Sequence, residues 1–192
     1  MGTSRNSVRR TPARTAMNAG LIVRIALLTC MAMTSRHALA ENEQVFGEWM
    51  VSMTDDRDAL FAATFNDSGA IFGKWCTVAD GKCVWLLGMN VSCTAKGENA
   101  HPTLVNTTKG ATTLQVRCGG PISGGTYRYV FSSWQELESA LDGSERVGFA
   151  FPLDSGKFEV VRFSLNGMQQ ACNLAEKATA KLSSTSTKNE QL

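Results

Sequence analysis

Residues 75–85 read Trp-Cys-Thr-Val-Ala-Asp-Gly-Lys-Cys-Val-Trp, and this stretch decides the fold class. Both of its ends are rich in aromatic and β-branched residues, which favour strands. The Asp80-Gly81 dipeptide between them is a strong hairpin signal. Such a hairpin places Cys76 beside Cys83. We therefore expect an antiparallel sheet in which a disulfide closes this hairpin.

Short apolar segments of the same kind continue on both sides of the hairpin. They are rich in Val, Phe and Trp, and residues that favour turns separate them. The expected strands cover residues 45–53, 60–65, 70–77, 82–89, 102–106, 112–117, 126–131, 147–151 and 158–165. Many short strands with frequent turns indicate antiparallel sheets. We predict a mainly β fold, an antiparallel β-sandwich or open barrel stapled by disulfides.

Two short helices interrupt the expected strands. Ser133 and Glu136 have the spacing of a capping box, which predicts that a helix begins there. A second helix is expected after Asn166, where apolar residues recur at helical spacing. Near its C-terminus the chain becomes polar and low in complexity. We expect a single β-rich domain over residues 45–180 and a disordered polar tail over residues 181–192.

The first 40 residues differ in charge from the rest of the chain. They hold six of the 19 Lys and Arg residues and none of the 17 Asp and Glu residues. The remainder therefore has 13 basic against 17 acidic residues, a net charge of −4. After the basic start come an apolar run over residues 20–33 and small side chains at Ala38 and Ala40, the pattern of a signal peptide. We predict cleavage after Ala40 and a mature protein that is periplasmic or secreted.

Other interpretations of this leader stay open. A membrane anchor needs about 20 apolar residues, and this run is shorter and is interrupted by Arg24. Cys30 ends a segment similar to a lipoprotein box and could be lipidated, and translation could start at Met17 instead of Met1. Past residue 41 no segment is apolar enough to cross a bilayer, so we expect no transmembrane segment in the mature chain.

Five cysteines remain after the predicted cleavage: Cys76, Cys83, Cys93, Cys118 and Cys172. In an exported chain, cysteines are interpreted first as disulfides, and five of them allow several arrangements of two bridges. Their order suggests one bridge between Cys76 and Cys83 and a second between Cys93 and Cys118. Cys172 is then a free thiol, buried on an apolar helix face or, alternatively, reactive. The spacings match no zinc signature.

No set of residues predicts a catalytic, cofactor-binding or metal site. His101 is the one histidine after residue 40, and its polar surroundings indicate a surface loop. Asp55 and Asp56 belong to a charged turn that resembles a calcium loop only loosely. Residues 119–125 are rich in Gly and are expected to form a loop between strands that could bind a partner. The acidic body argues against nucleic-acid binding.

Both ends of the expected domain resemble the invasion-associated locus B family, exported proteins of Gram-negative bacteria. The early segment Phe-Gly-Glu-Trp-Met-Val over residues 46–51 is similar to the family's Gly-x-Trp-x-Val strand. The late segment over residues 158–168, continued to Ala171, is similar to its strand-to-helix pattern Phe-Ser-Leu-x-Gly-Phe-x-x-Ala, with Met168 in the usual Phe place. The resemblance implies a β-sandwich-like periplasmic protein tied to host interaction or envelope function, without known catalysis.

We therefore expect an exported, non-enzymatic protein of the Gram-negative envelope that binds a protein or envelope partner through its loops. One alternative is a periplasmic inhibitor or immunity protein that blocks an exported hydrolase with the loop over residues 119–125. A second alternative is an enzyme that depends on the thiol of Cys172 or the imidazole of His101. No cofactor is expected under the first interpretation.

Overall fold

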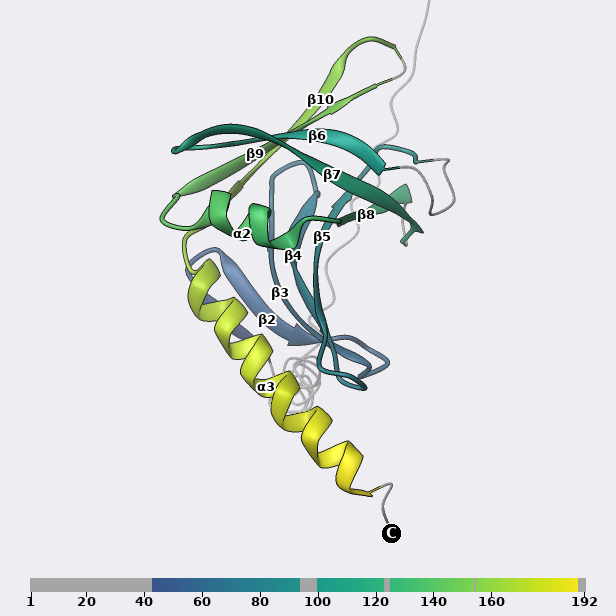
Figure 1. The fold of residues 1–192 in the computed structure, drawn as a ribbon, viewed down its shortest axis with the longest axis vertical. Helices are drawn as coiled ribbons and strands as arrows, with labels where there is room; N and C mark the ends of the chain where they lie inside the picture. Colours follow the sequence, from purple (N-terminus) through teal and green to yellow (C-terminus); the bar gives the residue numbers. More distant parts are fainter. Residues whose placement is uncertain (1–42, 94–99, 123–124, 154, 190–192) are drawn as a thin grey trace, which may run out of the picture. The chain divides into compact units, whose positions relative to one another are not determined.

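Ten antiparallel strands form one continuous sheet in the computed structural model, which describes residues 43–93, 100–122, 125–153 and 155–189 (Figure 1). The strands follow the order β1-β2-β3-β4-β5-β8-β7-β6-β9-β10 across this sheet. All described residues lie in one compact unit, Asn42–Leu192. The strands are β1 (Gln44–Phe46), β2 (Trp49–Met53), β3 (Ala59–Phe65), β4 (Ile71–Thr77), β5 (Cys83–Met89), β6 (Ala100–Thr107), β7 (Gly110–Pro121), β8 (Tyr127–Phe131), β9 (Arg146–Pro152) and β10 (Phe158–Ser164).

The prediction of a mainly β fold with antiparallel strands and two helices is confirmed. One expected strand was wrong: residues 45–53 form two strands, not one. Gly47 has a φ of +57° and turns the chain between β1 and β2, which then pair with each other. The predicted leader, with its cleavage after Ala40 and the thiol of Cys30, lies outside the described residues.

The hairpin of β4 and β5 forms as its sequence predicts. The Thr77 amide donates to the Lys82 carbonyl, and the Gly81 amide donates to the Thr77 carbonyl. Gly81 has a φ of +69°, which glycine adopts without the steric cost that other residues meet. Cys76 and Cys83 lie directly opposite each other in the register and are joined by a disulfide. The turn chemistry therefore sets the register of both strands.

The sheet curls so that its two halves face each other across a single core. We call β1–β5 the first half-sheet and β6, β7, β9 and β10 the second half-sheet, with β8 joining them. Phe72 on β4 lies 4.9 Å from Phe149 on β9 and 5.6 Å from Phe163 on β10, measured between ring centroids. Residues from opposite ends of the strand order therefore share one core, as in an open barrel.

A seam between β2 and the end of β10 closes this barrel. The Trp49 indole N–H donates to the Ser164 carbonyl at 2.9 Å, and the Glu48 amide donates to the Asn166 carbonyl at 3.0 Å. Gly167 has a φ of +93°, and a Cβ added there would lie 1.7 Å from the Phe46 carbonyl oxygen. Only glycine allows the two chain segments to approach this closely. The seam therefore joins the two segments that carry the family resemblance.

Two helices lie on the sheet, α2 (Trp134–Leu141) and α3 (Met168–Asn189). Leu137 and Leu141 on α2 are buried in the core. The predicted capping box is wrong in its detail, because Ser133 stands at the N-cap position but its side chain makes no capping hydrogen bond. α3 packs against β1–β4 (Figure 1).

α3 extends further than the sequence suggested. We expected a disordered tail from residue 181, and the structure continues the helix to Asn189. The hydroxyls of Ser184 and Thr185 donate to the Lys181 carbonyl and so satisfy local hydrogen bonds within the helix. Among the described residues, no helix has the length and apolar character needed to cross a membrane.

Two disulfides are present among the described residues, and their pairing is the one that the order of the cysteines suggested. The first joins Cys76 to Cys83 within one hairpin. The second joins Cys93, in the segment after β5, to Cys118 on β7. The second bridge therefore ties the end of the first half-sheet to the second half-sheet. Cys172 is buried and free.

Candidate functional site

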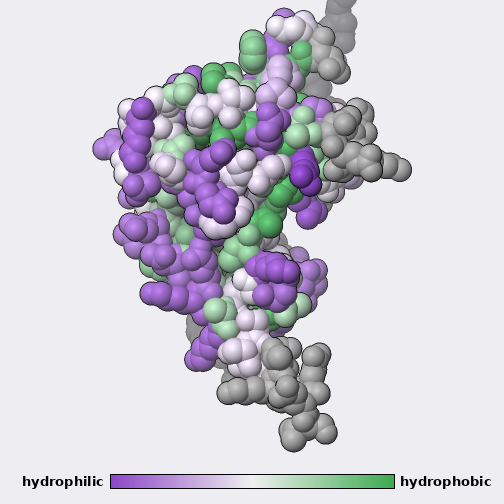
Figure 2. All heavy atoms as spheres, viewed as in Figure 1, coloured by the Kyte–Doolittle hydropathy of each residue, from purple (hydrophilic) through white to green (hydrophobic). Residues whose placement is uncertain are grey.

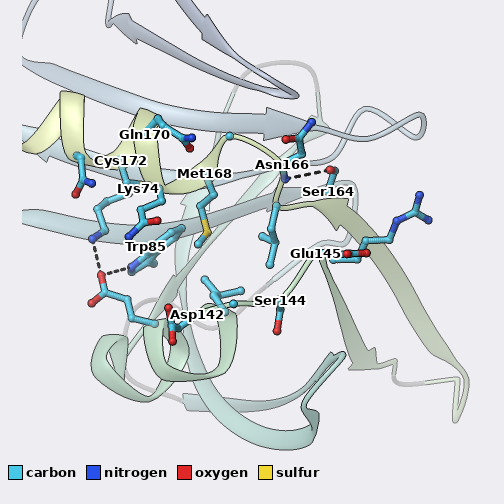
Figure 3. Close-up of a pocket in the computed structure, with 18 of the residues that line it drawn as sticks. Lys74, Trp85, Asp142, Ser144, Glu145, Ser164, Asn166, Met168, Gln170 and Cys172 are labelled. Atoms are coloured by element: carbon cyan, nitrogen blue, oxygen red, sulfur yellow. Dashed lines mark hydrogen bonds and ion pairs between the residues drawn. The ribbon is translucent and has the colours of Figure 1, made fainter.

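A cavity of about 820 Å³ lies between α2, the start of α3, and the strands β4 and β5 (Figure 3). Its floor is formed by Lys74, Trp85 and Cys172. Its rim is formed by two connections, residues 142–146 between α2 and β9 and residues 164–167 between β10 and α3. Polar side chains therefore surround much of this cavity.

Lys74 is the feature that distinguishes this floor from the rest of the core. Its register partners on the same face of the sheet are Ala62 on β3 and Trp85 on β5, which are both buried. Phe72, two residues before it, is the centre of the aromatic core. Lys74 itself is only 8% exposed. A cation thus occupies an inward position where the strand pattern calls for an apolar side chain.

Two carboxylates, one from each helix, compensate this cation. The Lys74 Nζ donates to Glu138 Oε1 on α2 at 2.5 Å and to Glu176 Oε1 on α3 at 2.6 Å. The Trp85 indole N–H donates to the same Glu138 oxygen at 3.0 Å, and the Lys74 Nζ lies 5.0 Å from the Trp85 ring centroid. Figure 3 shows Lys74 and Trp85 side by side, with hydrogen bonds drawn to the carboxylate between them. We call Lys74, Glu138, Glu176 and Trp85 the lysine cluster.

The surroundings of the lysine cluster keep Lys74 charged. Burial alone would lower the pKa of Lys74, but the hydrogen bonds and the attraction from Glu138 and Glu176 outweigh it, so the pKa is raised above 10.5. One cation faces two carboxylates, so the cluster has a formal net charge of −1. The carboxylate side chains are 34% and 41% exposed, and both residues line the cavity. The excess negative charge therefore faces the hollow.

The free thiol on the floor is not activated. The pKa of Cys172 is raised to about 12, mainly by burial; Lys74 lowers it, and Glu176 and Glu138 raise it. Reactive cysteines have a pKa below that of a free thiol, because the thiolate is the nucleophile. Ser144 on the rim donates its hydroxyl proton to the Ala140 carbonyl. The thiol of Cys172 is therefore not suited to act as a nucleophile, and the other polar and charged groups of the cavity are suited to holding a ligand.

The rim adds further polar groups from two loops. Asp142, Ser144 and Glu145 come from the connection after α2, and Asn166 and Gln170 come from the connection before α3 and its first turn. Figure 3 shows these side chains arranged around the opening, and Figure 2 shows mostly hydrophilic residues on the outward side of α3. Within the described ranges, no three His, Cys, Asp or Glu side chains are grouped so that they could hold a metal ion.

The candidate residues from the sequence fall in different places. Cys172 lies on the cavity floor. His101 is half-buried on β6, not in a surface loop, because the strand begins two residues earlier than the sequence suggested. Asp55 and Asp56 lie in the turn between β2 and β3. None of the last three lines the cavity.

The glycine-rich loop is shorter than expected. β7 continues to Pro121, and Gly120 pairs with Arg128 on β8 beyond a bulge at Gly119. Residues 123–124 lie outside the described part of the chain. A plug formed by the whole of residues 119–125 is therefore not what the structure contains.

Sequence reasoning missed the lysine cluster. One signal for Lys74 was present, because it alternates with Phe72 and Cys76 and so shares their inward face. The register confirms this face, since Phe72 and Cys76 are both fully buried. The two carboxylates had no comparable signal. Glu138 and Glu176 lie on different helices, and they come together only because each helix is placed so that its glutamate reaches Lys74 on β4.

Comparison with known proteins relates this chain to a solved structure. No protein-family model and no curated protein sequence matches this chain. Among solved structures, the chain is similar to invasion associated protein B from Bartonella henselae, with a TM-score of 0.52 and 12% sequence identity. The match covers 73% of this chain and 99% of that protein. The two proteins therefore share a fold over nearly the whole of the Bartonella chain.

Proposed function

We propose that this chain is an exported, non-enzymatic protein of the Gram-negative envelope, related to the invasion-associated locus B family, that binds a protein or envelope partner through the loops around the cavity. The fold shared with invasion associated protein B is the observation that carries the proposal. The two disulfides support it as well, because disulfides persist mainly in oxidising compartments.

The seam gives a structural reason for the family resemblance. The early motif supplies Gly47 and Trp49, and the late motif supplies Ser164 and Gly167. Each pair is 115 or more residues from the other in sequence, and they meet in the fold. Ser164 and Gly167 also line the cavity. The same motif thus closes the barrel and forms one wall of the proposed binding site.

The charge of the cavity favours a partner that presents a cationic group. The lining residues include four carboxylates, from Glu138, Asp142, Glu145 and Glu176, and two cationic side chains, from Lys74 and Arg146. Lys74 is already held by two of the carboxylates. Asp142 also pairs with Lys109 at 3.5 Å, on the surface. A Lys or Arg side chain of a partner would compensate the negative charge that remains and complete the hydrogen bonds of the exposed carboxylate oxygens.

The compartment is tested by fractionating cells that express the full chain with a C-terminal tag. We expect recovery from the periplasm or medium, a new N-terminus at Glu41 and two disulfides by non-reducing mass spectrometry. Recovery of the intact chain from the cytosol with all cysteines reduced would contradict the proposal.

The binding role is tested by deleting the gene and measuring envelope integrity and entry into host cells. We expect a defect in one of these measurements and its repair by the wild-type chain. A chain with Glu176→Gln is expected to repair it poorly, while Glu159→Gln, on β10 outside the cavity, repairs it fully. No defect in either measurement, or equal repair by both variants, would count against the proposed role of the cavity.

A further inference from the structure

The outward face of the five adjacent strands β6–β10 has a charge pattern that differs from the rest of the chain. Buried residues such as Val105, Phe149 and Val161 face the core on these strands, so the residues that alternate with them face outward. The outward residues are the even-numbered ones of β6, β8, β9 and β10 and the odd-numbered ones of β7 before its bulge. None of these strand positions is Asp or Glu, although residues 41–192 contain 17 acidic and 13 basic residues.

Three arginines on this face have no ionic partner in the described part of the chain. Arg117 on β7, Arg128 on β8 and Arg162 on β10 are exposed, and none of them forms an ion pair or a side-chain hydrogen bond with another described residue. A fourth, Arg146 at the start of β9, also lines the cavity and is not counted here. Glu159, the acidic residue of β10, is on the inward side of its strand. The outward side therefore carries positive charge that no acidic strand residue compensates.

An exposed apolar stripe lies between the arginines. Val160, Ala150 and Leu104 are side by side in the register of β10, β9 and β6. Val160 and Leu104 are each 44% exposed, and Phe158, two residues before Val160, is 66% exposed. Arg162 lies in the next row of the register on one side of this stripe, and Arg117 lies beyond the stripe on its other side. We call the following residues the arginine face: Leu104, Arg117, Arg128, Phe158, Val160 and Arg162.

Exposed apolar residues alone do not distinguish this face. The first half-sheet also exposes apolar side chains, such as Phe65, which is 56% exposed. The outward residues of β3–β5 are all uncharged, however, so the arginine face differs in combining exposed apolar side chains with uncompensated cations. Such a surface is complementary to a partner that is anionic at its surface and apolar beneath it. A bilayer that contains anionic phospholipids has this structure.

The β9–β10 hairpin extends far enough to enter such a surface. β9 pairs with β6 only as far as Ala150, whereas β9 and β10 stay paired as far as Pro152 and Phe158. The end of the hairpin therefore projects beyond its pairing with β6, as Figure 1 shows. Lys157 is exposed and directly precedes Phe158. This end thus presents an aromatic ring next to a further cation.

We propose that the arginine face binds the surface of a membrane that contains anionic phospholipids. The guanidinium groups donate paired hydrogen bonds to the headgroup phosphates, a geometry for which arginine is well suited. Phe158 and Val160 enter the boundary between the headgroups and the acyl chains, where apolar side chains leave water. An acidic protein or a nucleic acid matches the charge but not the exposed apolar stripe. This contact does not use the cavity, so it goes beyond the proposed function and does not depend on it.

The number of groups indicates weak binding that depends on salt. Each cation close to an anionic membrane surface strengthens binding by about fivefold. All three arginines are exposed, so salt screens their attraction to the phosphates. We therefore expect reversible binding that is strong enough to detect at low salt and is lost at high salt.

The chain offers matched controls for both kinds of side chain. Lys177 and Lys181 on α3 are exposed and form no ion pair with a described residue, so replacing both changes the net charge as much as replacing two arginines of the face. Phe65 is the control for Phe158, because both are exposed, outward phenylalanines at the end of a strand. These pairs separate the arginine face from net charge and from exposed apolar surface in general.

The experiment is co-sedimentation of the full chain, recovered after export, with two kinds of vesicle. One contains phosphatidylglycerol and phosphatidylethanolamine, and the other contains phosphatidylcholine alone. The wild type is expected to bind the first kind and not the second. Arg117→Gln with Arg162→Gln should weaken binding at least tenfold, and Phe158→Ser should weaken it by about tenfold through the loss of a buried ring. Lys177→Gln with Lys181→Gln, and Phe65→Ser, should leave it unchanged.

An unchanged urea unfolding transition shows that each variant is folded, and the arginine and phenylalanine variants test the face independently. The proposal is overturned if the wild type does not bind the anionic vesicles at low salt, even if it binds an acidic protein instead. Equal binding to both kinds of vesicle, or equal weakening in the control variants, also overturns it. None of these results would alter the proposed role of the cavity, which is tested by Glu176→Gln.

Discussion

The two half-sheets follow different rules for the side of the sheet that faces away from the core. On β7 of the second half-sheet, Leu114 and Val116 are buried and alternate with the exposed Thr113, Gln115 and Arg117. This alternation is what solvent on one face produces. On β3–β5 of the first half-sheet, the outward positions are as apolar as the inward ones. The one cation among these strands, Lys74, is on the inward face.

In the first half-sheet the usual distribution of side chains is reversed at one point: a charged side chain faces inward while apolar side chains face outward. Charge is placed inside, where the lysine cluster fixes α2 and α3 to β4, and apolar surface is placed outside. The outward face of the second half-sheet mixes the two kinds of side chain, because Leu104, Val160 and Phe158 are exposed there beside Asn106 and Arg162. The inward position that breaks the usual alternation, Lys74, therefore lies where the candidate site is found.

The largest expected effect comes from the bridge that joins the half-sheets. Replacing Cys93 and Cys118 with Ala is expected to lower the free energy of unfolding by about 3.5 kcal/mol, because the bridge closes a loop with a sequence separation of 25. Replacing Cys76 and Cys83, within one hairpin, should cost about 2.4 kcal/mol, because their separation is 7. Equilibrium urea denaturation measures both. The reverse order would show that the join between the half-sheets matters less than the hairpin.

The inward charge of the first half-sheet gives the next effect. Lys74→Met leaves two carboxylates without their cation and is expected to destabilise the protein by about 3 kcal/mol, at the low end for buried pairs because both carboxylates are partly exposed. Lys82→Met is the control, since Lys82 pairs with Asp80 on the surface, where such pairs contribute about 0–1 kcal/mol. Similar losses in the two variants, measured by thermal and urea unfolding, would remove the special role of the inward cation.

The seam between the half-sheets gives a smaller effect. Trp49→Phe keeps most of the buried ring and removes the indole donor to the Ser164 carbonyl. We expect a loss of about 2–3 kcal/mol, because the fully buried side chain loses its hydrogen bond and the smaller ring leaves a cavity. Trp75→Phe on β4, whose ring faces away from the core and stacks on Phe61, removes the same indole and is expected to cost about 0.5–1 kcal/mol. Equal losses would mean that the seam hydrogen bond contributes nothing beyond packing.

The thiol below the cavity gives the smallest effect at neutral pH. The pKa of Cys172 rises from 9.0 to about 12 through burial, so the native thiolate population is roughly a thousandfold below that of the unfolded chain. Alkylation by iodoacetamide should be correspondingly slow until urea unfolds the protein. The folded thiol keeps its proton between about pH 9 and 12 while the unfolded thiol loses it, so stability should fall across this range. Fast labelling of Cys172 at pH 8 in native buffer would contradict the burial.

Much of the fold could be predicted because its signals are local. The Asp80-Gly81 turn and the alternation on β7 depend on neighbouring residues, and both appear in the structure as expected. The pairing Cys76–Cys83 followed from the same hairpin. The division of the first expected strand was missed because Gly47 turns the chain to meet Asn166, a residue far away in sequence.

The candidate site could not be predicted, because it is assembled from distant segments. Lys74, Glu138 and Glu176 are separated by 64 and 102 residues, measured from Lys74, and no local pattern connects them. The outward residues of β3–β5 can be named from the alternation of each strand in the sequence. Only the register shows that apolar residues of the three strands lie side by side on the face opposite the core.

The seam also limits when folding of this protein can be completed during synthesis or export. Trp49 and Ser164 are 115 residues apart, and the glycine that lets their segments touch comes later still, at residue 167. A chain that emerges from its N-terminus, from a ribosome or through a narrow export channel, presents the acceptor for this contact only near its end. Until then the segment of β10 that contacts Trp49 is missing, and the apolar surfaces of the first strands stay exposed. They avoid aggregation only if chaperones bind them or if the rest of the chain folds quickly. A chain truncated before Gly167 should therefore be a substrate for proteolysis and not a smaller version of the same barrel.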